Sequence, residues 1–225
     1  MMPRLLLIET SHRRGWVALT EGERVIGMRH LEESRRHARD LVPFAKELLD
    51  EQGWKARDLQ GVVVDRGPGS YTGLRVGIIS AKTLAYAVGC PLISFDAFDA
   101  IAEQSPNAAT IDVIADAQQD KVYVQRYRRN GEAVKAATEL AIIPVADWIS
   151  RIEDGQTVSG PALELFRERL PSSAVVAAEE AWTPQPATAL RLVLARLQRD
   201  ERDDLFSLEP LYLRPSSAEE NWKKS

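Results

Sequence analysis

The chain has 225 residues, of which 44% are hydrophobic and 28% are charged. This composition is typical of a folded globular protein, and the length suits one large domain or two small ones. The net charge is −4, whereas proteins that bind nucleic acid on their own are generally basic. Any contact with RNA is therefore expected through a partner chain or a small local patch.

The chain has a single cysteine, Cys90, which excludes both an internal disulfide and a cysteine-based metal site. A reducing compartment is the natural expectation. The apolar run at residues 5–8 is too short for a signal peptide, and no segment approaches the length that a bilayer span needs. The sequence thus predicts a soluble, cytoplasmic protein that makes no contact with membranes.

The first hundred residues predict strands alternating with helices. Three strands joined by tight polar turns are expected at residues 4–10, 15–19 and 25–31. Residues 39–52 predict an amphipathic helix, in which Pro43 is compatible only with the first turn or with a kink. The elements expected after it are a strand at 61–65, a helix ending at 88, a strand at 91–95 and a short helix at 96–104.

A glycine-rich string, GPGSYTGLRVG at residues 67–77, joins the strand at 61–65 to the helix after it. Apolar residues recur there at helical spacing, from Leu74 and Ile78 to Val88. Ser70 or Thr72 is suited to cap the helix, and Gly89 followed by Pro91 is a stop signal.

Such a turn has two interpretations. Backbone N–H groups at a helix start can bind an anion, and glycines let a ligand or another chain approach closely. The turn can equally be a tight connection and nothing more. It is not a P-loop, since no Gly-Lys-Ser/Thr closes it, and Thr72 stands where the dinucleotide fingerprint needs glycine.

After a break at residues 105–107, the second half repeats the pattern of strands followed by mixed elements. Strands are expected at 110–115, 121–128, 140–144, 157–160 and 174–178, and helices at 145–152, 163–170 and 186–199. This repetition predicts an α/β fold of two subdomains, residues 1–104 and 105–225, whose mixed sheets are flanked by helices. A return of the tail, from residue 203 on, to the first subdomain stays open.

The glycine-rich string closely resembles GPGSFTGLRxG, the signature of the TsaB (YeaZ-type) family, with Tyr71 in place of the usual Phe. Segments 5–11, 37–43, 112–124 and 211–214 are similar to other elements of that family. The chain departs from the family pattern at three places. Glu9 replaces the usual Asp, Ala117-Gln118 stands where Ala-Arg is common, and the His12-Arg13-Arg14 turn is bulkier than usual.

The resemblance implies an actin-like (ASKHA, ribonuclease H-like) fold and a role in making threonylcarbamoyladenosine in bacterial tRNA. It implies a non-catalytic scaffold that pairs with the TsaD (Kae1-type) transferase, works with the ATPase TsaE and forms a homodimer in isolation. Contact with tRNA is expected to be indirect. No cofactor is expected to bind the chain alone. ATP or ADP is expected, if at all, only at the interface of the complex.

The expected contact surface is the glycine-rich turn, which faces a partner or a phosphate, together with the helix that follows it. Its turn residues are Gly67, Pro68, Gly69, Ser70, Tyr71, Thr72, Gly73, Leu74 and Arg75, and its helix residues are Ile78, Ile79, Lys82 and Tyr86.

No complete catalytic constellation is visible in the sequence. TsaD carries a His-x-x-x-His pair, but neither His12 nor His30 stands three or four residues from His37, so no metal site and no catalytic residue is expected. Neither His-Glu-x-x-His nor Gly-x-Ser-x-Gly occurs, which argues against a protease. The alternative is an independent phosphotransferase or ATPase of the actin-like fold, with Glu9, Asp65 and Asp116 as the candidate carboxylates.

Overall fold

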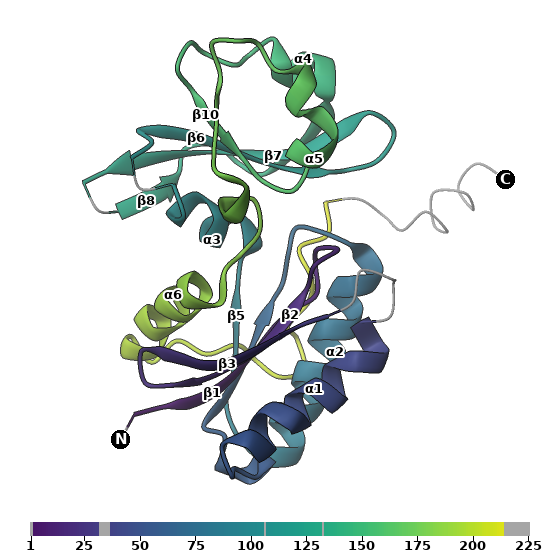
Figure 1. Cartoon of the computed structure of the whole chain (residues 1–225), viewed down its shortest axis with the longest axis vertical. Coiled ribbons are helices and arrows are strands. Elements are labelled where there is room, and N and C mark those ends of the chain that lie inside the picture. Colours follow the sequence, from purple (N-terminus) through teal and green to yellow (C-terminus); the bar gives the residue numbers. More distant parts are fainter. Residues whose placement is uncertain (1, 32–36, 106, 132, 214–225) are drawn as a thin grey trace, which may run out of the picture.

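The computed structural model describes residues 2–31, 37–105, 107–131 and 133–213. Within them the chain forms two mixed sheets that lie one above the other along the long axis of the molecule, each flanked by helices (Figure 1). This arrangement confirms the predicted α/β fold with two mixed sheets. No helix in the described ranges is both long enough and apolar enough to cross a membrane.

The first sheet has the strand order β3-β2-β1-β4-β5. β1, the central strand, pairs antiparallel with β2 and parallel with β4, so the sheet changes from antiparallel to parallel pairing at β1. β1 and β4 therefore end at the same edge of the sheet. The strands are β1 (Arg4–Glu9), β2 (Trp16–Glu21), β3 (Arg24–His30), β4 (Gly61–Asp65) and β5 (Leu92–Phe95).

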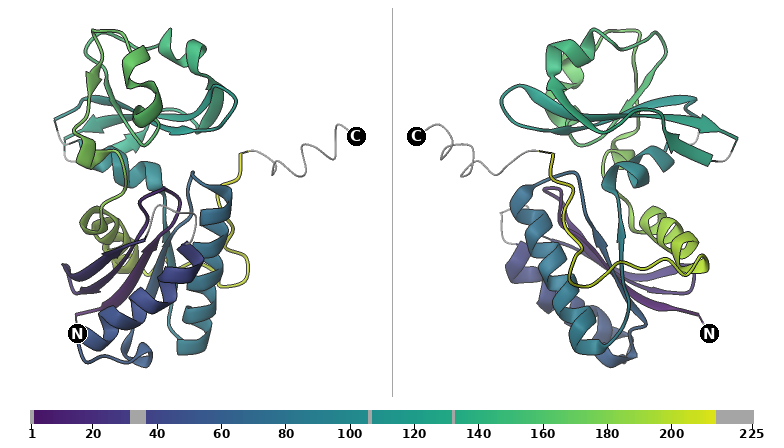
Figure 2. Two further views of the ribbon diagram at one scale, coloured as in Figure 1. Left: turned by 45° about the vertical axis from the view of Figure 1, so that its right-hand side comes forward. Right: turned by 180° about the vertical axis from the view of Figure 1, so that it is seen from behind.

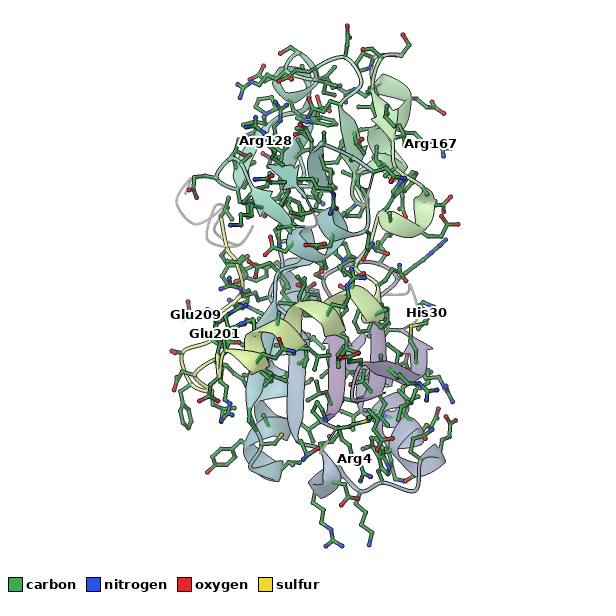
Figure 3. The ribbon with its side chains drawn as sticks, turned by 90° about the vertical axis from the view of Figure 1, so that its left-hand side faces the viewer. Arg4, His30, Arg128, Arg167, Glu201 and Glu209 are labelled. Carbon is green, nitrogen blue, oxygen red and sulfur yellow. The ribbon has the colours of Figure 1, made fainter. Side chains whose placement is uncertain are left out.

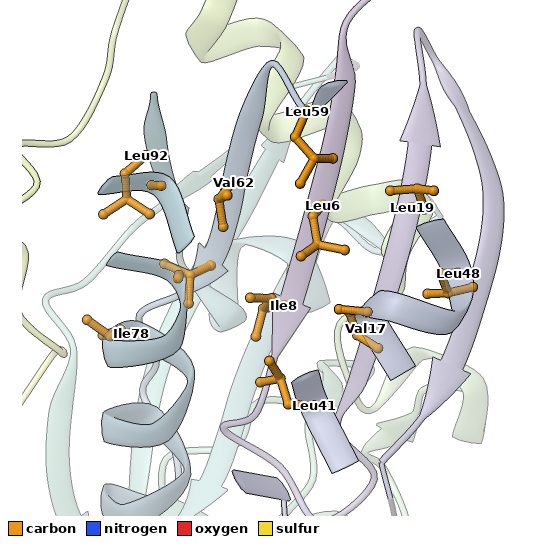
Figure 4. Packing of buried hydrophobic residues seen from close by; sticks show 14 of the residues in the cluster. Leu6, Ile8, Val17, Leu19, Leu41, Leu48, Leu59, Val62, Ile78 and Leu92 are labelled. Atoms are coloured by element: carbon orange, nitrogen blue, oxygen red, sulfur yellow. The ribbon is translucent and has the colours of Figure 1, made fainter. Parts of the chain in front are cut away.

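Both faces of the first sheet are covered, because side chains alternate along each strand. Leu6 and Ile8 of β1 pack under α1 (His37–Glu51) and α2 (Tyr71–Val88), as Figure 4 shows. Leu5 and Leu7 face the opposite side, where they pack with α6 (Pro186–Gln198). Each fully buried leucine stabilises the fold by roughly 1.5–3 kcal/mol.

The two helices on one face of this sheet test the predicted boundaries. α2 is capped at its start by Ser70, whose Oγ accepts a hydrogen bond from Gly73 N at 3.2 Å, and it ends at Gly89 with φ of 73°. Both signals were read correctly. α1 begins at His37, two residues before the predicted start, so Pro43 lies inside the helix and beyond its first turn. Of the two alternatives that the sequence left for Pro43, the first turn is therefore excluded.

The second sheet has the order β11-β10-β6-β7-β8, and β9 also pairs with β7. Its strands are β6 (Thr110–Asp116), β7 (Lys121–Asn130), β8 (Ala133–Ala136), β9 (Ala141–Pro144), β10 (Thr157–Ser159) and β11 (Val175–Val176). β8 was not predicted, because its four residues are mostly exposed and carry no apolar alternation.

Helices cover both faces of the second sheet as well. Ile111 and Val113 pack with α3 (Ala97–Glu103), whereas Ile114 packs with α4 (Val145–Ile149) and α5 (Leu163–Phe166). α4 and α5 are shorter than predicted, and α5 continues as a 3-10 helix at Arg167–Arg169. Two further 3-10 helices lie at Ala56–Asp58 and Glu179–Ala181.

The end of the described chain returns to the first sheet. After α6, Asp203 forms a β-bridge with Leu92 and an ion pair with Arg196 at 3.0 Å. Leu211 N then donates to Arg66 O at 2.8 Å. Seen from behind, the tail runs beside β5 and α2 (Figure 2). The division of the chain at residue 104 stays a prediction, but α6 and the tail pack with the first sheet.

Candidate functional site

The glycine-rich turn packs directly on the end of β1. A Cβ atom on Gly73 would lie 1.9 Å from Thr10 O, and one on Gly77 would lie 2.2 Å from Thr10 Oγ1. Thr10 Oγ1 donates to Gly73 O at 2.8 Å. No side chain fits in these places, so Gly73 and Gly77 are needed for the close approach of α2 to the strand.

Several N–H groups of the turn already have partners within the chain. Ser70 N donates to Ser11 O at 2.8 Å, and Gly67 N donates to Asp65 Oδ1 at 2.7 Å. Gly73 N is bound by the Ser70 cap. Three donors that an anion would use are thus already bound within the chain, and contact of the turn with phosphate stays a prediction.

The predicted contact residues divide between core and surface. The side chain of Ile78 is 4% exposed and belongs to the core under α2, whereas Ile79 is 62% exposed and Tyr86 is 71% exposed. Ile78 is thus not available on the surface. Of the others, Gly67, Pro68, Gly73 and Leu74 are buried, Gly69, Tyr71 and Lys82 are half-buried, and Ser70, Thr72 and Arg75 are exposed.

The tail lies against this surface. The sequence left open a return of the tail to the first subdomain, but its contact with α2 was not predicted. The Arg75 guanidinium lies 4.2 Å from the centre of the Tyr71 ring, and its Nε donates to Tyr212 Oη at 3.0 Å. The two tyrosine rings are 4.8 Å apart. Lys82 Nζ donates to the carbonyl of Phe206, whose side chain is 80% exposed. The only signal in the sequence was the family-like ending at 211–214, and Arg214 lies outside the described residues.

A buried polar cluster lies behind the turn, where β1 and β4 end side by side. It consists of Glu9, Ser11, His12 and Asp65. Ser11 Oγ is 2.7 Å from Glu9 Oε1 and 2.8 Å from His12 Nδ1, and it also contacts Asp65 Oδ2. His12 Nδ1 is 3.0 Å from Glu9 Oε1. The chain therefore brings together two of the three carboxylates that the sequence singled out.

The hydrogen bonds in this cluster require a shared proton. The Ser11 hydroxyl has one proton to donate, yet it contacts two carboxylates. Burial and the neighbouring charge of Glu9 raise the pKa of Asp65 to about 7. Below about pH 7, the Asp65 carboxyl group therefore supplies the missing proton.

Glu9 and His12 form the charged part of the cluster. Burial opposes the charge on Glu9, but the attraction of His12 and hydrogen bonds from His12 and Ser11 outweigh it, so the pKa of Glu9 is lowered. Burial likewise opposes a charge on His12, while Glu9 raises the pKa of the imidazole. The cluster is thus a buried Glu9–His12 ion pair beside a protonated Asp65.

The third candidate carboxylate, Asp116, is not part of this cluster. It closes the turn between β6 and β7, where its Oδ1 accepts a hydrogen bond from Gln118 N at 2.8 Å. A separate hollow of about 420 Å³ is lined by Arg13 and Arg14, which directly follow His12 of the buried cluster in the sequence. Its other lining residues, Glu164, Arg167, Glu179 and Trp182, come from the second half of the chain.

The sequence model of the family described as tRNA N6-adenosine threonylcarbamoyltransferase, TsaD, matches residues 27–222. The chain belongs to this family. Two relatives share nearly its full length, and both are named tRNA threonylcarbamoyladenosine biosynthesis protein TsaB. The Bacillus subtilis protein is 26% identical over 98% of each chain, and the Escherichia coli protein is 27% identical over 98% of this chain and 97% of the relative.

Two solved structures have a fold similar to that of this chain. YeaZ from Pseudomonas aeruginosa has a TM-score of 0.78 at 26% identity, over 94% of this chain and all of the other. A second structure, of an uncharacterized protein with similarity to peptidase YEAZ from Pseudomonas aeruginosa, has a TM-score of 0.79 at 26% identity, over 95% of this chain and all of the other. The resemblance to the TsaB (YeaZ-type) proteins of this family is confirmed, and with it the actin-like fold of two mixed sheets.

Proposed function

We propose that the chain works in the biosynthesis of threonylcarbamoyladenosine in tRNA, as a scaffold that binds a TsaD-type transferase and carries out no chemistry itself. The observation that carries the proposal is the near full-length similarity to the two proteins named for this biosynthesis. The exposed apolar side chains of α2 give the proposal a physical site on this chain.

The state of the candidate carboxylates supports a role without catalysis. Glu9 and Asp65 are completely buried, and their contacts are made to Ser11, His12 and the backbone of the turn. A general base must reach the proton that it removes from a substrate, directly or through one water molecule. Two carboxylates enclosed in this way are suited to holding the turn in place.

The outer face of α2 supports a role in association. Ile79 and Tyr86 stand seven residues apart, which places them on one side of the helix, and Val42 of the neighbouring α1 is 63% exposed. Exposed apolar groups of this kind mark surfaces that bind other chains. We infer that this face binds the TsaD-type partner, and that a homodimer uses it when the partner is absent.

The remaining parts of the proposal concern the assembly. TsaE is the expected source of ATP hydrolysis, and ATP or ADP binds at most where subunits meet. The tRNA is contacted chiefly by the partner, which agrees with the net charge of −4. An independent phosphotransferase is the alternative, and the hollow lined by Arg13, Arg14 and Arg167 offers its nucleotide a site.

Two assays on purified protein test the proposal. Sedimentation of the chain mixed with the TsaD protein of the same organism should give a complex, and the chain alone should neither hydrolyse ATP nor cleave casein. ATP turnover that survives repurification and is lost in Asp65→Asn would favour the phosphotransferase. Absence of any complex at micromolar concentrations would contradict the scaffold.

A further inference from the structure

The buried cluster of Glu9, His12 and Asp65 has the composition of a metal site. Each residue offers one ligand atom, and the three atoms lie within 4.8 Å of one another. All three side chains are buried. We propose that this cluster binds one zinc ion, with the Ser11 hydroxyl as a fourth donor. This inference does not depend on the proposed function.

The spacing of the donor atoms suits a small tetrahedral ion. Zinc binds histidine nitrogen and carboxylate oxygen at about 2.0–2.2 Å, which places tetrahedral ligands roughly 3.3–3.5 Å from each other. The measured separations are 2.7 Å from Ser11 Oγ to Glu9 Oε1, 2.8 Å from Ser11 Oγ to His12 Nδ1, and 3.0 Å from His12 Nδ1 to Glu9 Oε1. An outward movement of about 0.5 Å therefore opens the site.

A second observation concerns the hydrogen bonds of Glu9. Its Oε1 accepts from Ser11 N, Ser11 Oγ and His12 N, and it also contacts His12 Nδ1. Its Oε2 is buried and has no hydrogen-bond partner among the described residues. A buried carboxylate oxygen without a partner is costly. A cation that the Glu9 carboxylate binds through both Oε1 and Oε2 removes that cost.

The charge of the cluster also favours a cation. Without a proton on Asp65, two carboxylates and a protonated imidazole carry one excess negative charge, so the cluster needs two protons, one on His12 and one on Asp65, to be neutral. A divalent ion replaces these shared protons, and its binding releases them. Imidazole as a ligand favours zinc, whereas magnesium keeps several water molecules and a fully buried cluster has little room for them.

Two of the proposed ligands are not the residues that are usual in the TsaB (YeaZ-type) pattern. Glu9 and His12 are two of the positions where the sequence departs from that pattern, and the structure shows them in contact with each other. The ion would join β1, the turn after it and β4. Because Asp65 also binds Gly67 N, the same ion would anchor the start of the glycine-rich turn.

The test uses the full chain purified without chelators, analysed for metal, then unfolded in urea with EDTA and refolded with or without Zn²⁺. Unfolding is included because the ligands are buried. We expect about one zinc per chain, release of protons during uptake, and a melting temperature several degrees higher with zinc. Mn²⁺ and Mg²⁺ serve as comparison ions and should bind at least tenfold more weakly.

Three variants separate this site from adventitious binding. His12→Asn and Asp65→Asn keep polar groups of similar shape and should weaken zinc binding at least tenfold. His30→Asn removes an exposed histidine of β3 (Figure 3) and should bind like the unaltered chain. If the unaltered chain refolds in zinc without taking up the ion, or if all three variants bind equally, protons alone hold the cluster and the proposal is wrong.

Discussion

Gly73 illustrates at the scale of one residue why the signature string contains glycines. Its missing side chain lets α2 rest on the carbonyl of Thr10, which is 1.9 Å from the place of a Cβ atom. The sequence of the string suits a phosphate-binding turn or a surface that contacts another chain. Its glycines also have a structural role within the chain, because they allow the start of α2 to pack directly against the end of β1.

Gly73→Ala should therefore destabilise the chain by about 1–3 kcal/mol, because the added methyl group forces α2 away from β1. Thr72→Ala is the matched control, since Thr72 is the exposed neighbour in the same turn of helix and such changes usually stay within about 0.5 kcal/mol. Urea unfolding monitored by tryptophan fluorescence measures both. Equal stability of the two variants would mean that the close approach to Thr10 does not constrain the turn.

The outer face of α2 is the feature that matters at the scale of elements. One side of this helix packs in the core through Ile78 and Ala81, and the other presents Ile79 and Tyr86 to solvent. The helix is thus apolar on two sides, and only one of them packs on the sheet. We propose that the TsaD-type partner binds the second side.

A charge on that side, Ile79→Asp or Tyr86→Asp, should weaken association with the TsaD-type partner and self-association by about 2–5 kcal/mol while the chain stays folded. Leu165→Asp on α5 is the control, because Leu165 is equally exposed, at 60%, but lies in the second half of the chain. Sedimentation gives association and thermal unfolding gives stability. Unchanged association in both α2 variants would move the interface elsewhere.

The tail is fixed to the first sheet by Asp203, which pairs with Arg196 and accepts from Ser94 N. Burial opposes the charge on Asp203, but the Arg196 hydrogen bond and charge lower the pKa of this carboxyl group. A lowered folded pKa stabilises the fold above the unfolded pKa of about 3.9 and this stabilisation is lost as pH falls through the folded value.

Asp203→Asn should accordingly cost about 1 kcal/mol at pH 7, a value reduced for the partial exposure of the ion pair. The difference between the variant and the unaltered chain should be smaller at pH 3 than at pH 7, because at pH 3 the carboxyl group of the unfolded chain is already mostly protonated. Urea unfolding at the two pH values measures this difference. A difference that stays constant, or that grows in acid, would show that the charge of Asp203 does not hold the tail.

At the scale of the whole molecule, local patterns could be read from the sequence and contacts between distant segments could not. The Ser70 cap, the Gly89 stop and the burial of β1 and β4 follow from neighbouring residues. The contact of Ser11 with Asp65 joins residues 54 positions apart. It depends on β1 and β4 being adjacent and parallel, which periodicity alone does not reveal.

The path of the tail depended on packing in the same way. α6 shows a clear helical pattern, but nothing in that pattern says which sheet it covers. Likewise, the contact of the Tyr212 ring with the Tyr71 ring needs the tail to cross α2. Arg75, a residue of the predicted contact surface, donates a hydrogen bond to Tyr212 of the tail, which lies 137 positions further along the chain.

The most direct test of the account measures threonylcarbamoyladenosine in tRNA digests from cells depleted of this protein. The modified nucleoside should disappear, and it should return with the unaltered chain or with Leu165→Asp but not with Ile79→Asp expressed at the same level. Unchanged modification after depletion would contradict a role in this biosynthesis, and full rescue by Ile79→Asp would contradict binding of the partner through the outer face of α2.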